Sequence, residues 1–403
     1  MDLEPIKDRA ADLGLDIAGD ATQRVCGKIL VLITEDWFAL SHFQPLLRVL
    51  RTLSDDVAVV TASSGRLADL RALGVRTIEF NMRRGSFNPI AQARVSRRLA
   101  RLIEDEGPDA VHAISLQPML LASLALAGAR SRPRALLLHV TGLGYIGASR
   151  SAFAILLRAV IFALIRWSTR RTQLWLLAEN PDDLAALTGR GIGSAAHSSI
   201  VPGAGVDPHA FPAQPVPEHA TPRAAYVGRL IRSKGVEVLV QAFEILRARG
   251  VAFELALYGA PDLHNPDAVS ADTLGRWSDT SGLSWHGHVS DVPSVWREAD
   301  IAVVPTLGGE GVPRAMLEAA ACARPLIVSD VPGCNHFVRQ GVEGFIVPPA
   351  DPEALAEALA KAARDPELRR RQGAAARARL LSGYTTAAVG RALRDAYRRL
   401  FSS

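Results

Sequence analysis

The stretch IAVVPTLGGEGVPRAMLEAAACARPLIVS, from Ile301 to Ser329, decides the fold of this 403-residue chain. A run of apolar, branched residues leads into a glycine-rich loop. A segment of helix-forming residues follows from Arg314 to Cys322, and then a second apolar run. Unbroken apolar runs of this length are typical of strands that are buried on both faces of a parallel sheet. The order strand, helix, strand therefore predicts a parallel α/β unit.

The same alternation extends in both directions along the chain. In the C-terminal half the expected strands also include AAYVG and FELALYG before this stretch and GFIVP after it, and the N-terminal half has KILVLITE, VAVVTA, DAVHAIS, ALLLHV and LWLLAEN. Between the two series, PGAGVDPHAFPAQPVPEHATP (Pro202 to Pro222) is rich in proline and glycine and follows neither the helical nor the strand period, as a linker does. We predict an α/β protein of two doubly wound, Rossmann-like domains that face a cleft.

These patterns set the expected boundaries. Residues 1–26 form a leader that we expect to be poorly ordered, and residues 27–200 form the N-terminal domain. The linker covers residues 201–222, and the C-terminal domain covers residues 223–384. Residues 385–403 are expected to form a helix that packs back on the N-terminal domain.

Composition narrows the classes of function. With 48% hydrophobic and 22% charged residues the chain is globular, and its net charge of +5 suits an anionic ligand or an anionic membrane surface but is too small to indicate nucleic acid. Cys26, Cys322 and Cys334 lie far apart, which argues for a reducing compartment and against a disulfide framework or a zinc site. No stretch near the first residue has signal-peptide character, so we expect a cytoplasmic protein.

The loop GRLIRSKG, from Gly228 to Gly235, directly follows an expected strand and precedes an expected helix. It presents Arg229 and Lys234 beside the free amides of a helix N-terminus, an arrangement that fits a diphosphate. The spacing is not that of a P-loop. The alternative is a solvated surface turn.

Two carboxylates form the second candidate. Glu310 ends a glycine-rich loop, and Glu318 follows after seven residues within an apolar helix, where a carboxylate needs hydrogen-bond donors. Sugar and ribose hydroxyls are suitable donors, and Gly311 and Val312 would offer amides at the helix start. The alternative role for Glu318 is a structural pair with Arg314, four residues earlier.

Two further motifs are weaker. GLGYIG, from Gly142 to Gly147, has the dinucleotide-binding spacing, but it follows a late strand and lacks the acidic partner near position 163, which argues against a nicotinamide enzyme. His286, His288 and Asp291 could belong to a metal site, although two histidines that flank a glycine more often serve packing or hydrogen bonding. We expect neither a metal nor a cofactor.

The C-terminal motifs together resemble a known family. VGRLIRSKG, LYG (Leu257 to Gly259), DVPSVWREADIAVVPT and EGVPRAMLEAAACARPLIVSDVPG resemble the retaining glycosyltransferases of family 4, which have the GT-B fold. The resemblance implies that Arg229 and Lys234 hold the diphosphate of a nucleotide-sugar donor, most often a UDP-sugar, that Glu310 holds the transferred sugar, and that no metal is needed. It implies a front-face displacement in which the donor phosphate is the base. The implied donor-binding residues are Gly228, Gly259, Gly311, Val312 and Glu318.

The N-terminal half adds an implied acceptor. TEDWFALSHFQPLLRVL and HVTGLGYIG resemble a subgroup that acts on polyprenyl-diphosphate-linked sugars in bacterial surface-polysaccharide assembly. Many family members have a histidine before the glycine of the second motif, where this chain has Thr141, so His42, His139, Thr141 and Gly142 are all candidates for the N-domain contact. Two alternatives to a glycosyltransferase are a sugar-nucleotide epimerase of the same fold and a non-catalytic protein that binds sugar nucleotides.

One apolar segment raises the question of a membrane. SAFAILLRAVIFALIRW, from Ser151 to Trp167, is short for a bilayer span and is interrupted by Arg158 and Arg166. It is either a core helix or a helix that lies in the headgroup region. Because further arginines flank it, we expect residues 150–171 to contact an anionic membrane surface, which would place the protein peripherally on the inner face of the cytoplasmic membrane.

Overall fold

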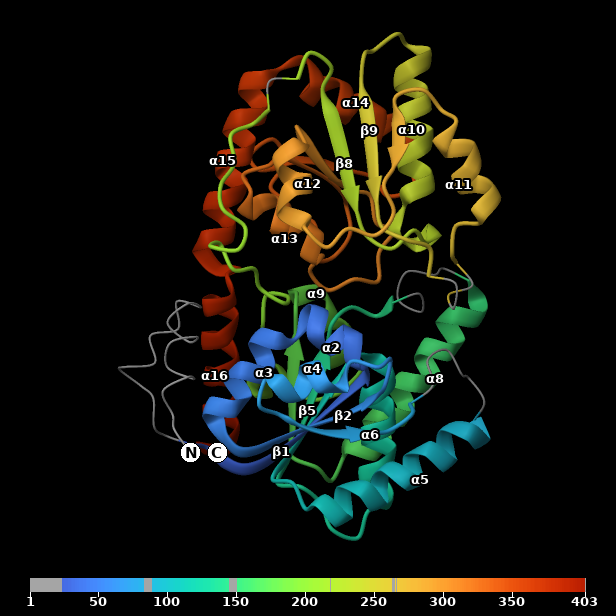
Figure 1. The fold of residues 1–403 in the computed structure, drawn as a ribbon. Helices are drawn as coiled ribbons and strands as arrows, with labels where there is room; N and C mark the ends of the chain where they lie inside the picture. Colours follow the sequence, from blue (N-terminus) through green and yellow to red (C-terminus); the bar gives the residue numbers. More distant parts are fainter. Residues whose placement is uncertain are drawn as a thin grey trace. The chain divides into compact units, whose positions relative to one another are not determined.

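The computed structural model describes residues 24–82, 89–144, 151–217, 219–262, 265 and 267–402 (Figure 1). The chain forms two compact units. The N-terminal unit runs to Gly205 and resumes at Thr386, and the C-terminal unit runs from Val206 to Thr385. Each unit is built on a parallel sheet, so the predicted α/β class with two Rossmann-like domains is confirmed. Most of the expected leader, residues 1–23, lies outside the described residues.

The N-terminal unit contains a seven-stranded sheet in the order β3-β2-β1-β4-β5-β6-β7, with parallel pairing. Its strands are β1 (Cys26–Glu35), β2 (Ser54–Ala62), β3 (Arg76–Glu79), β4 (Ala110–Ile114), β5 (Ala135–Val140), β6 (Leu174–Ala178) and β7 (Ser198–Ile200). Its helices are α2 (Asp36–His42), α3 (Gln44–Leu53), α4 (Leu67–Ala72), α5 (Pro89–Glu106), α6 (Leu116–Gly128), α8 (Ala152–Thr169), α9 (Pro181–Thr188), the short η1 (Ala195–His197) and α16 (Thr386–Ser402). The strand order changes direction at β1, as in doubly wound sheets.

Helix α16 belongs to the N-terminal unit although it ends the sequence. It packs on α3 and against β7. Val389, Leu393, Tyr397 and Leu400 are each at most 2% exposed and join the core that lies against β1 and β2. Successive apolar residues spaced by four or three positions give α16 this buried face.

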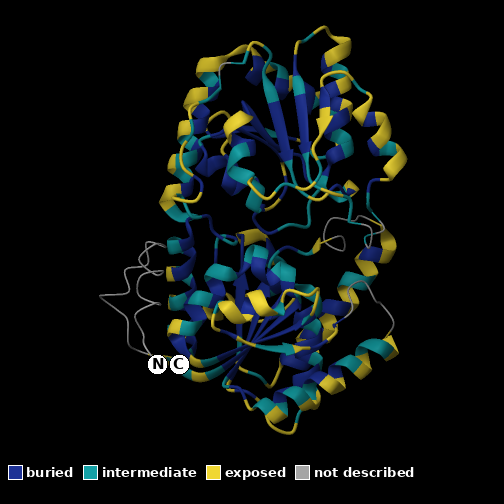
Figure 2. Cartoon of the chain, in the orientation of Figure 1, coloured by how far each residue is buried: buried dark blue, intermediate teal, exposed yellow. Residues whose placement is uncertain are grey.

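Helix α8 forms in the segment that the sequence marked as apolar. Ile161, Phe162 and Ile165 are buried in the core on the other face of the sheet, where α8 packs against α6. Phe153 and Leu156 are about two-thirds exposed, at 67% and 65%. Figure 2 shows buried and exposed residues along this helix. It is therefore neither a fully buried core helix nor wholly exposed.

The C-terminal unit contains a six-stranded sheet in the order β10-β9-β8-β11-β12-β13. Its strands are β8 (Arg223–Val227), β9 (Glu254–Tyr258), β10 (Leu283–Trp285), β11 (Ile301–Val304), β12 (Leu326–Ser329) and β13 (Gly344–Val347). Its helices are η2 (Arg232–Lys234), α10 (Val236–Ala248), α11 (Ala271–Ser278), α12 (Val292–Glu298), α13 (Arg314–Ala321), α14 (Pro352–Arg364) and α15 (Pro366–Gly383). Two apolar cores cover the two faces of the sheet.

Much of the expected linker is fixed to the C-terminal unit. The guanidinium of the fully buried Arg324 donates to the carbonyl oxygens of Gln214 and Pro215 at 2.5 and 2.6 Å, and to those of Ala299 and Cys322 at 3.0 and 3.1 Å. These bonds satisfy backbone groups that neither sheet nor helix pairs. The division between the units therefore falls at Gly205, near the start of the predicted linker.

Candidate functional site

The charged residues of interest gather at the carboxyl ends of strands in the C-terminal unit. Arg229 and Lys234 follow β8, and Glu310 follows β11, which is the neighbour of β8 in the sheet. Strands β9 and β10 extend the sheet beyond β8, and β12 and β13 extend it beyond β11. The strand order thus changes direction between β8 and β11, the place where ligands bind in open α/β sheets.

Glycines let the loops approach one another closely at this edge. Gly235 has φ +73° and a Cβ there would lie 1.8 Å from the carbonyl oxygen of Pro305. Gly259 has φ +137°, and a Cβ there would lie 1.8 Å from the carbonyl oxygen of Gly228. Only glycine accepts both the backbone conformation and the contact. The predicted donor-binding residues Gly228 and Gly259 are therefore brought together by the packing of two loops.

Lys234 and Glu310 form an ion pair between the loops that follow β8 and β11. Their side chains are 26% and 18% exposed. The loops are also joined by the backbone, because the amide of Leu307 donates to the carbonyl oxygen of Ser233 at 2.9 Å. The structure thus holds the two side chains, which are far apart in sequence, at one point.

The carboxylate of Glu310 keeps its charge and has one free acceptor atom. Burial raises the pKa of Glu310, but the ammonium of Lys234, the hydroxyl of Thr306 and the charge of Arg229 together outweigh it, so the net pKa lies below its ordinary value. Among the described residues no donor reaches the buried Oε1. A buried acceptor without a donor is costly, and a hydroxyl from a ligand would satisfy it.

Arg229 is held by a carboxylate that sequence reasoning missed. Its Nη1 donates to Oδ2 of Asp262 at 2.8 Å, and 42% of its side chain is exposed. Its carbonyl oxygen accepts from the hydroxyl of Tyr226 at 2.8 Å. The signal for Asp262 was its position, a few residues after Gly259 at the end of a strand.

Glu318 forms the pair with Arg314 that the sequence offered as its alternative role. Nε of Arg314 donates to Oε1 of Glu318 at 2.7 Å, and the glutamate side chain is 8% exposed. Burial raises the pKa of Glu318 more than Arg314 lowers it. Gly311 and Val312 lie in the loop just before α13, separated from its first residue by Pro313.

The N-domain candidates occupy different environments. Thr141 and Gly142 follow the end of β5, and Oγ1 of Thr141 lies 2.8 Å from Oγ of Ser115, which follows the neighbouring β4. His42 is the last residue of α2 and is partly exposed, with Nδ1 2.6 Å from Oγ of Ser41. These three residues lie at the carboxyl ends of strands or in the helix that follows one.

His139 is part of a buried chain of rings. It is 1% exposed, and its Nδ1 lies 3.3 Å from Nε2 of His112. Nδ1 of His112 in turn lies 2.9 Å from the hydroxyl of Tyr397 in α16. Burial lowers the pKa of His139 to about 3, so its ring is neutral. The sequence had placed His139 among the candidates for a ligand contact, and the structure instead gives it core neighbours.

The two weaker sequence motifs, the histidine pair with Asp291 and GLGYIG, do not form a metal site within the described residues. The ring of His286 stacks on Tyr258 with centroids 4.6 Å apart, and Asp291 accepts from the amide of Ser294 at the start of α12. Within the described parts of the chain, no three His, Cys, Asp or Glu side chains gather as metal ligands. The second half of GLGYIG, residues 145–147, lies outside the described residues.

Comparison with known proteins matches both units. The family model "Glycosyl transferases group 1" matches residues 221–365, and the model "Glycosyl transferase 4-like domain" matches residues 41–174. The first range contains the Lys234–Glu310 pair and the residues around it, and the second contains the N-domain candidates.

Curated relatives match over different lengths. The capsular polysaccharide biosynthesis glycosyltransferase CapM of Staphylococcus aureus is 29% identical over 172 residues, which are 43% of this chain and 44% of the relative. The N,N'-diacetylbacillosaminyl-diphospho-undecaprenol alpha-1,3-N-acetylgalactosaminyltransferase of Campylobacter jejuni is 24% identical over 82% of this chain and 88% of its own. The match to CapM thus spans less than half of that relative's length.

Solved structures agree in fold. Anabaena HepE in complex with UDP and glucose superposes with a TM-score of 0.71 at 16% identity, over 92% of this chain and 98% of its own. Sucrose-phosphate synthase from Thermosynechococcus elongatus gives 0.75 at 19% identity, over 93% and 99%. Because the two family models together match more than half of the sequence, the chain belongs to the group 1 glycosyltransferases, which have the GT-B fold.

Proposed function

We propose that this protein transfers a sugar, with retention of configuration, from a nucleotide-diphosphate sugar to a polyprenyl-diphosphate-linked acceptor in bacterial surface-polysaccharide assembly. The observation that carries the proposal is the ion pair between Lys234 and Glu310, with Arg229 in the same loop as Lys234. A nucleotide sugar offers the matching groups, because its diphosphate suits the two cations and its sugar hydroxyls suit the carboxylate.

The donor would be held by charges that act on the leaving group. As the bond to the sugar breaks, negative charge grows on the departing diphosphate, and Arg229 and Lys234 would stabilise it. Oε1 of Glu310 would accept a hydrogen bond from a hydroxyl of the transferred sugar. The carboxylate of Glu318 would accept a hydrogen bond from a ribose hydroxyl. The donor phosphate would take the acceptor proton. UDP is our choice of nucleotide, supported by the HepE structures, which are complexes with UDP and glucose and with UDP-glucose.

The acceptor would meet the N-terminal unit. The name of the Campylobacter relative includes a diphospho-undecaprenol acceptor, and this supports the acceptor class proposed for this chain. His42, Thr141 and Gly142 are the residues we propose for its contact, since they lie at or after the carboxyl ends of strands. Such an acceptor would place the reaction at the cytoplasmic face of the membrane.

Transfer is expected to proceed without a metal ion or a cofactor. Two cationic side chains and the first amides of α10 would supply the positive charge that a metal ion supplies to a leaving diphosphate in metal-dependent enzymes. A chelator such as EDTA should therefore leave the rate of sugar transfer unchanged. Activity that EDTA abolishes and a divalent metal restores would contradict this expectation.

Donor screening tests the proposed function. Purified protein is heated with each of a panel of nucleotide sugars, and a rise in melting temperature identifies the donor. The donor is then incubated with and without polyprenyl-diphosphate-linked acceptors. Free nucleotide that is released only in the presence of acceptor supports transfer. Conversion of the donor without acceptor would indicate an epimerase, and binding without any turnover would indicate a non-catalytic protein.

A further inference from the structure

Helix α8 has a second apolar face that points away from the core. Five large apolar side chains recur along it at spacings of three and four residues, so they form one stripe. We call these residues the outer stripe: Phe153, Leu156, Val160, Leu164 and Trp167, which are 67%, 65%, 47%, 37% and 59% exposed. At about 100° per residue, the stripe covers an arc of about 80° that is well separated from the direction of Ile161 and Ile165.

Exposure of this kind is concentrated on α8. Of the eleven large hydrophobic residues that are exposed among the described residues, six lie on this one helix, the sixth being Ile155. Single exposed apolar residues are ordinary, whereas a contiguous patch marks a surface that binds a partner or a membrane. The outer stripe is therefore a candidate interaction surface.

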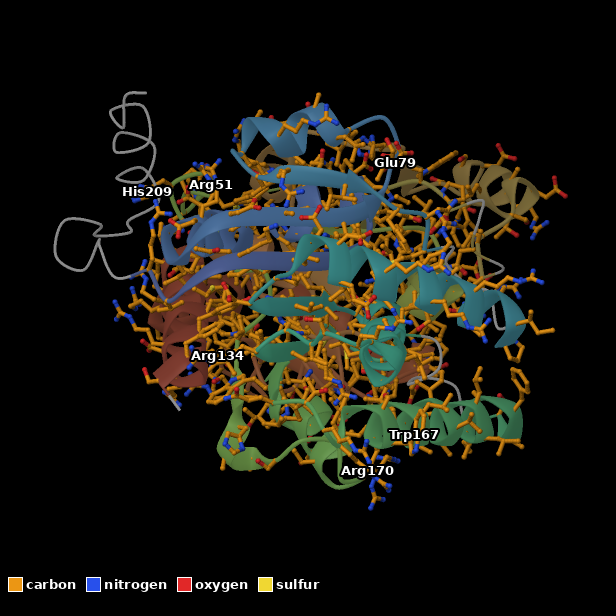
Figure 3. All side chains as sticks on the ribbon, turned by 90° about the horizontal axis from the view of Figure 1, so that it is seen from below. Arg51, Glu79, Arg134, Trp167, Arg170 and His209 are labelled. Carbon is orange, nitrogen blue, oxygen red and sulfur yellow. The ribbon has the colours of Figure 1, made fainter. Side chains whose placement is uncertain are left out.

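Positive charge adjoins the C-terminal end of the stripe. Arg170 and Arg171 directly follow α8 and are exposed, and Nη1 of Arg132 donates to the carbonyl oxygen of Arg171 at 3.1 Å. We call Arg132, Arg170 and Arg171 the basic cluster. Figure 3 labels Trp167 and Arg170 at this end of the helix, with Arg170 projecting outward. Helix α8 itself contains neither aspartate nor glutamate.

The packing of α8 argues against a transmembrane span. By length and composition it could cross a bilayer, with 18 residues and a mean hydropathy of 1.7. Yet 33% of it is buried inside the protein. A span would have to pull Ile161, Phe162 and Ile165 out of the core, so a membrane could meet this helix only with the helix in the plane of its surface.

A second copy of the chain fits this face poorly. In a two-fold dimer the two α8 helices would lie antiparallel, so each basic cluster would face the N-terminal end of the other copy's α8, which offers it no acidic residue. An anionic lipid surface instead offers apolar chains to the outer stripe and phosphate groups to the arginines. Tryptophan is favoured at that boundary, which suits Trp167 beside the cluster.

We propose that the outer stripe and the basic cluster dock the N-terminal unit onto a bilayer that contains anionic phospholipid, with α8 parallel to the surface. Docking would bring the protein to a lipid-linked acceptor, and this purpose rests on the proposed function. The docking itself does not depend on it. Vesicle binding requires neither donor nor acceptor. Its failure would leave the nucleotide-sugar site untouched, and failure of donor binding would leave the docking surface untouched.

Sedimentation of the full chain with vesicles tests the proposal. Vesicles of phosphatidylcholine alone are compared with vesicles that also contain phosphatidylglycerol, at low and at high salt. We expect binding only to the anionic vesicles, and weaker binding at high salt. Leu156→Ser with Trp167→Ser should lower the partition coefficient about tenfold or more, since exposed apolar area is lost.

Charge and control variants separate the two contributions. The double variant Arg170→Gln with Arg171→Gln should weaken vesicle binding by about fivefold for each charge removed. The double variant Arg170→Lys with Arg171→Lys keeps both charges and should bind as the wild type does. Val342→Ser with Leu381→Ser removes two exposed apolar residues of the C-terminal unit and should have no effect. Melting temperatures establish that each variant is folded. If the Leu156 and Trp167 pair fails to fold, Phe153→Ser with Val160→Ser replaces it.

Three outcomes would overturn the proposal. The wild-type protein could remain in the supernatant with anionic vesicles at low salt. The control variant could lose as much binding as the outer-stripe variant. Sedimentation velocity without lipid could reveal a dimer that the outer-stripe variant converts to a monomer, in which case a second copy covers this face.

Discussion

Lys234 and Glu310 come from different loops, and their ion pair joins those loops. Each side chain neutralises the other, so neither presents an unpaired charge to the apolar interior. A ligand that separates them must bring an anion for the ammonium and a hydrogen-bond donor for the carboxylate. A sugar diphosphate carries both groups a few bonds apart, which is why we propose it as the ligand of this pair.

Replacement of Lys234 or Arg229 with alanine should lower the rate of sugar transfer about a hundredfold or more. The reason is the lost stabilisation of the leaving diphosphate, which for single electrostatic donors in other enzymes is on the order of 3 kcal/mol. Turnover of the identified donor measures the effect. Arg232→Ala is the matched control, because Arg232 lies in the same loop but is 64% exposed and paired with Glu237. Near-normal rates in both single variants would refute the diphosphate assignment.

Replacement of Glu318 with glutamine distinguishes its two roles. If it binds ribose, donor affinity falls by more than the change in stability accounts for, because the neutral amide is a weaker hydrogen-bond acceptor than the carboxylate. If the pair with Arg314 is its whole role, the melting temperature falls and donor affinity is unchanged. Titration calorimetry and thermal unfolding measure the two quantities. Arg314→Gln, which breaks the same pair but keeps the carboxylate, is the control.

The sequence predicted Arg229, Lys234 and Glu310 because each follows an apolar strand, and parallel strands end at one edge. It could not predict Asp262 as the partner of Arg229, since nothing in the alternation of strands and helices specifies where that loop folds relative to the β8 loop. His112 was missed for a similar reason. Its contact with His139 depends on the register of β4 against β5, which only the folded sheet defines.

At the level of elements, α8 illustrates the limit of periodicity. Apolar residues occupy nearly its whole circumference, so the pattern predicts a helix but not the face that enters the core. In the structure the face with Ile161, Phe162 and Ile165 is buried, because α6 packs on that side of α8. In α16, by contrast, polar and apolar residues alternate at helical spacing, and the buried face can be read from the sequence.

The buried chain formed by β4, β5 and α16 should make stability sensitive to acid. Burial lowers the pKa of His139 to about 3 and holds the pKa of His112 well below its ordinary value. Between about pH 6.5 and 3 the unfolded chain therefore binds protons that the folded chain does not, and stability falls as the pH falls.

His139→Leu should remove part of this sensitivity. Between pH 7 and pH 5 the variant should lose on the order of 2 kcal/mol less of its unfolding free energy than the wild type does. Urea denaturation at the two pH values measures the difference. His209→Leu, at an exposed histidine, should leave the dependence as it is in the wild type. If the unfolding free energy of His139→Leu fell between pH 7 and pH 5 by as much as that of the wild type, His139 would not be a source of the acid sensitivity.

At the level of the whole molecule, the boundary between the units lies at Gly205, whereas the sequence predicted a linker that extends to residue 222. Proline and glycine remove periodicity from a segment whether or not it is packed, so the sequence showed a linker across residues 201–222. Arg324 fixes residues 214 and 215 to the C-terminal unit, and Arg377 donates to the carbonyl oxygen of Phe211 at 3.2 Å. The charged groups that determine this lie more than a hundred residues further along the chain.

Truncation of the chain after Thr385 should unfold the N-terminal unit and spare the C-terminal one. The loss of Val389, Leu393, Tyr397 and Leu400 removes about 1.5 to 3 kcal/mol for each buried side chain, a large fraction of the stability of an ordinary domain. Calorimetry should show one remaining unfolding transition, and nucleotide should still shift it. Removal of residues 402 and 403 alone is the control. Two intact transitions in the truncated protein would refute this account.

The placement of α16 has a consequence for biosynthesis. A ribosome makes the chain from its first residue, and domains generally begin to fold as they emerge. The unit that is translated first lacks one core helix until residues 386–402 have been made, because these residues complete it. The unit that is translated second, from Val206 to Thr385, is complete before α16 has been made. On the ribosome the later unit can thus finish folding first, while the apolar surface of α3 stays uncovered until α16 has been made.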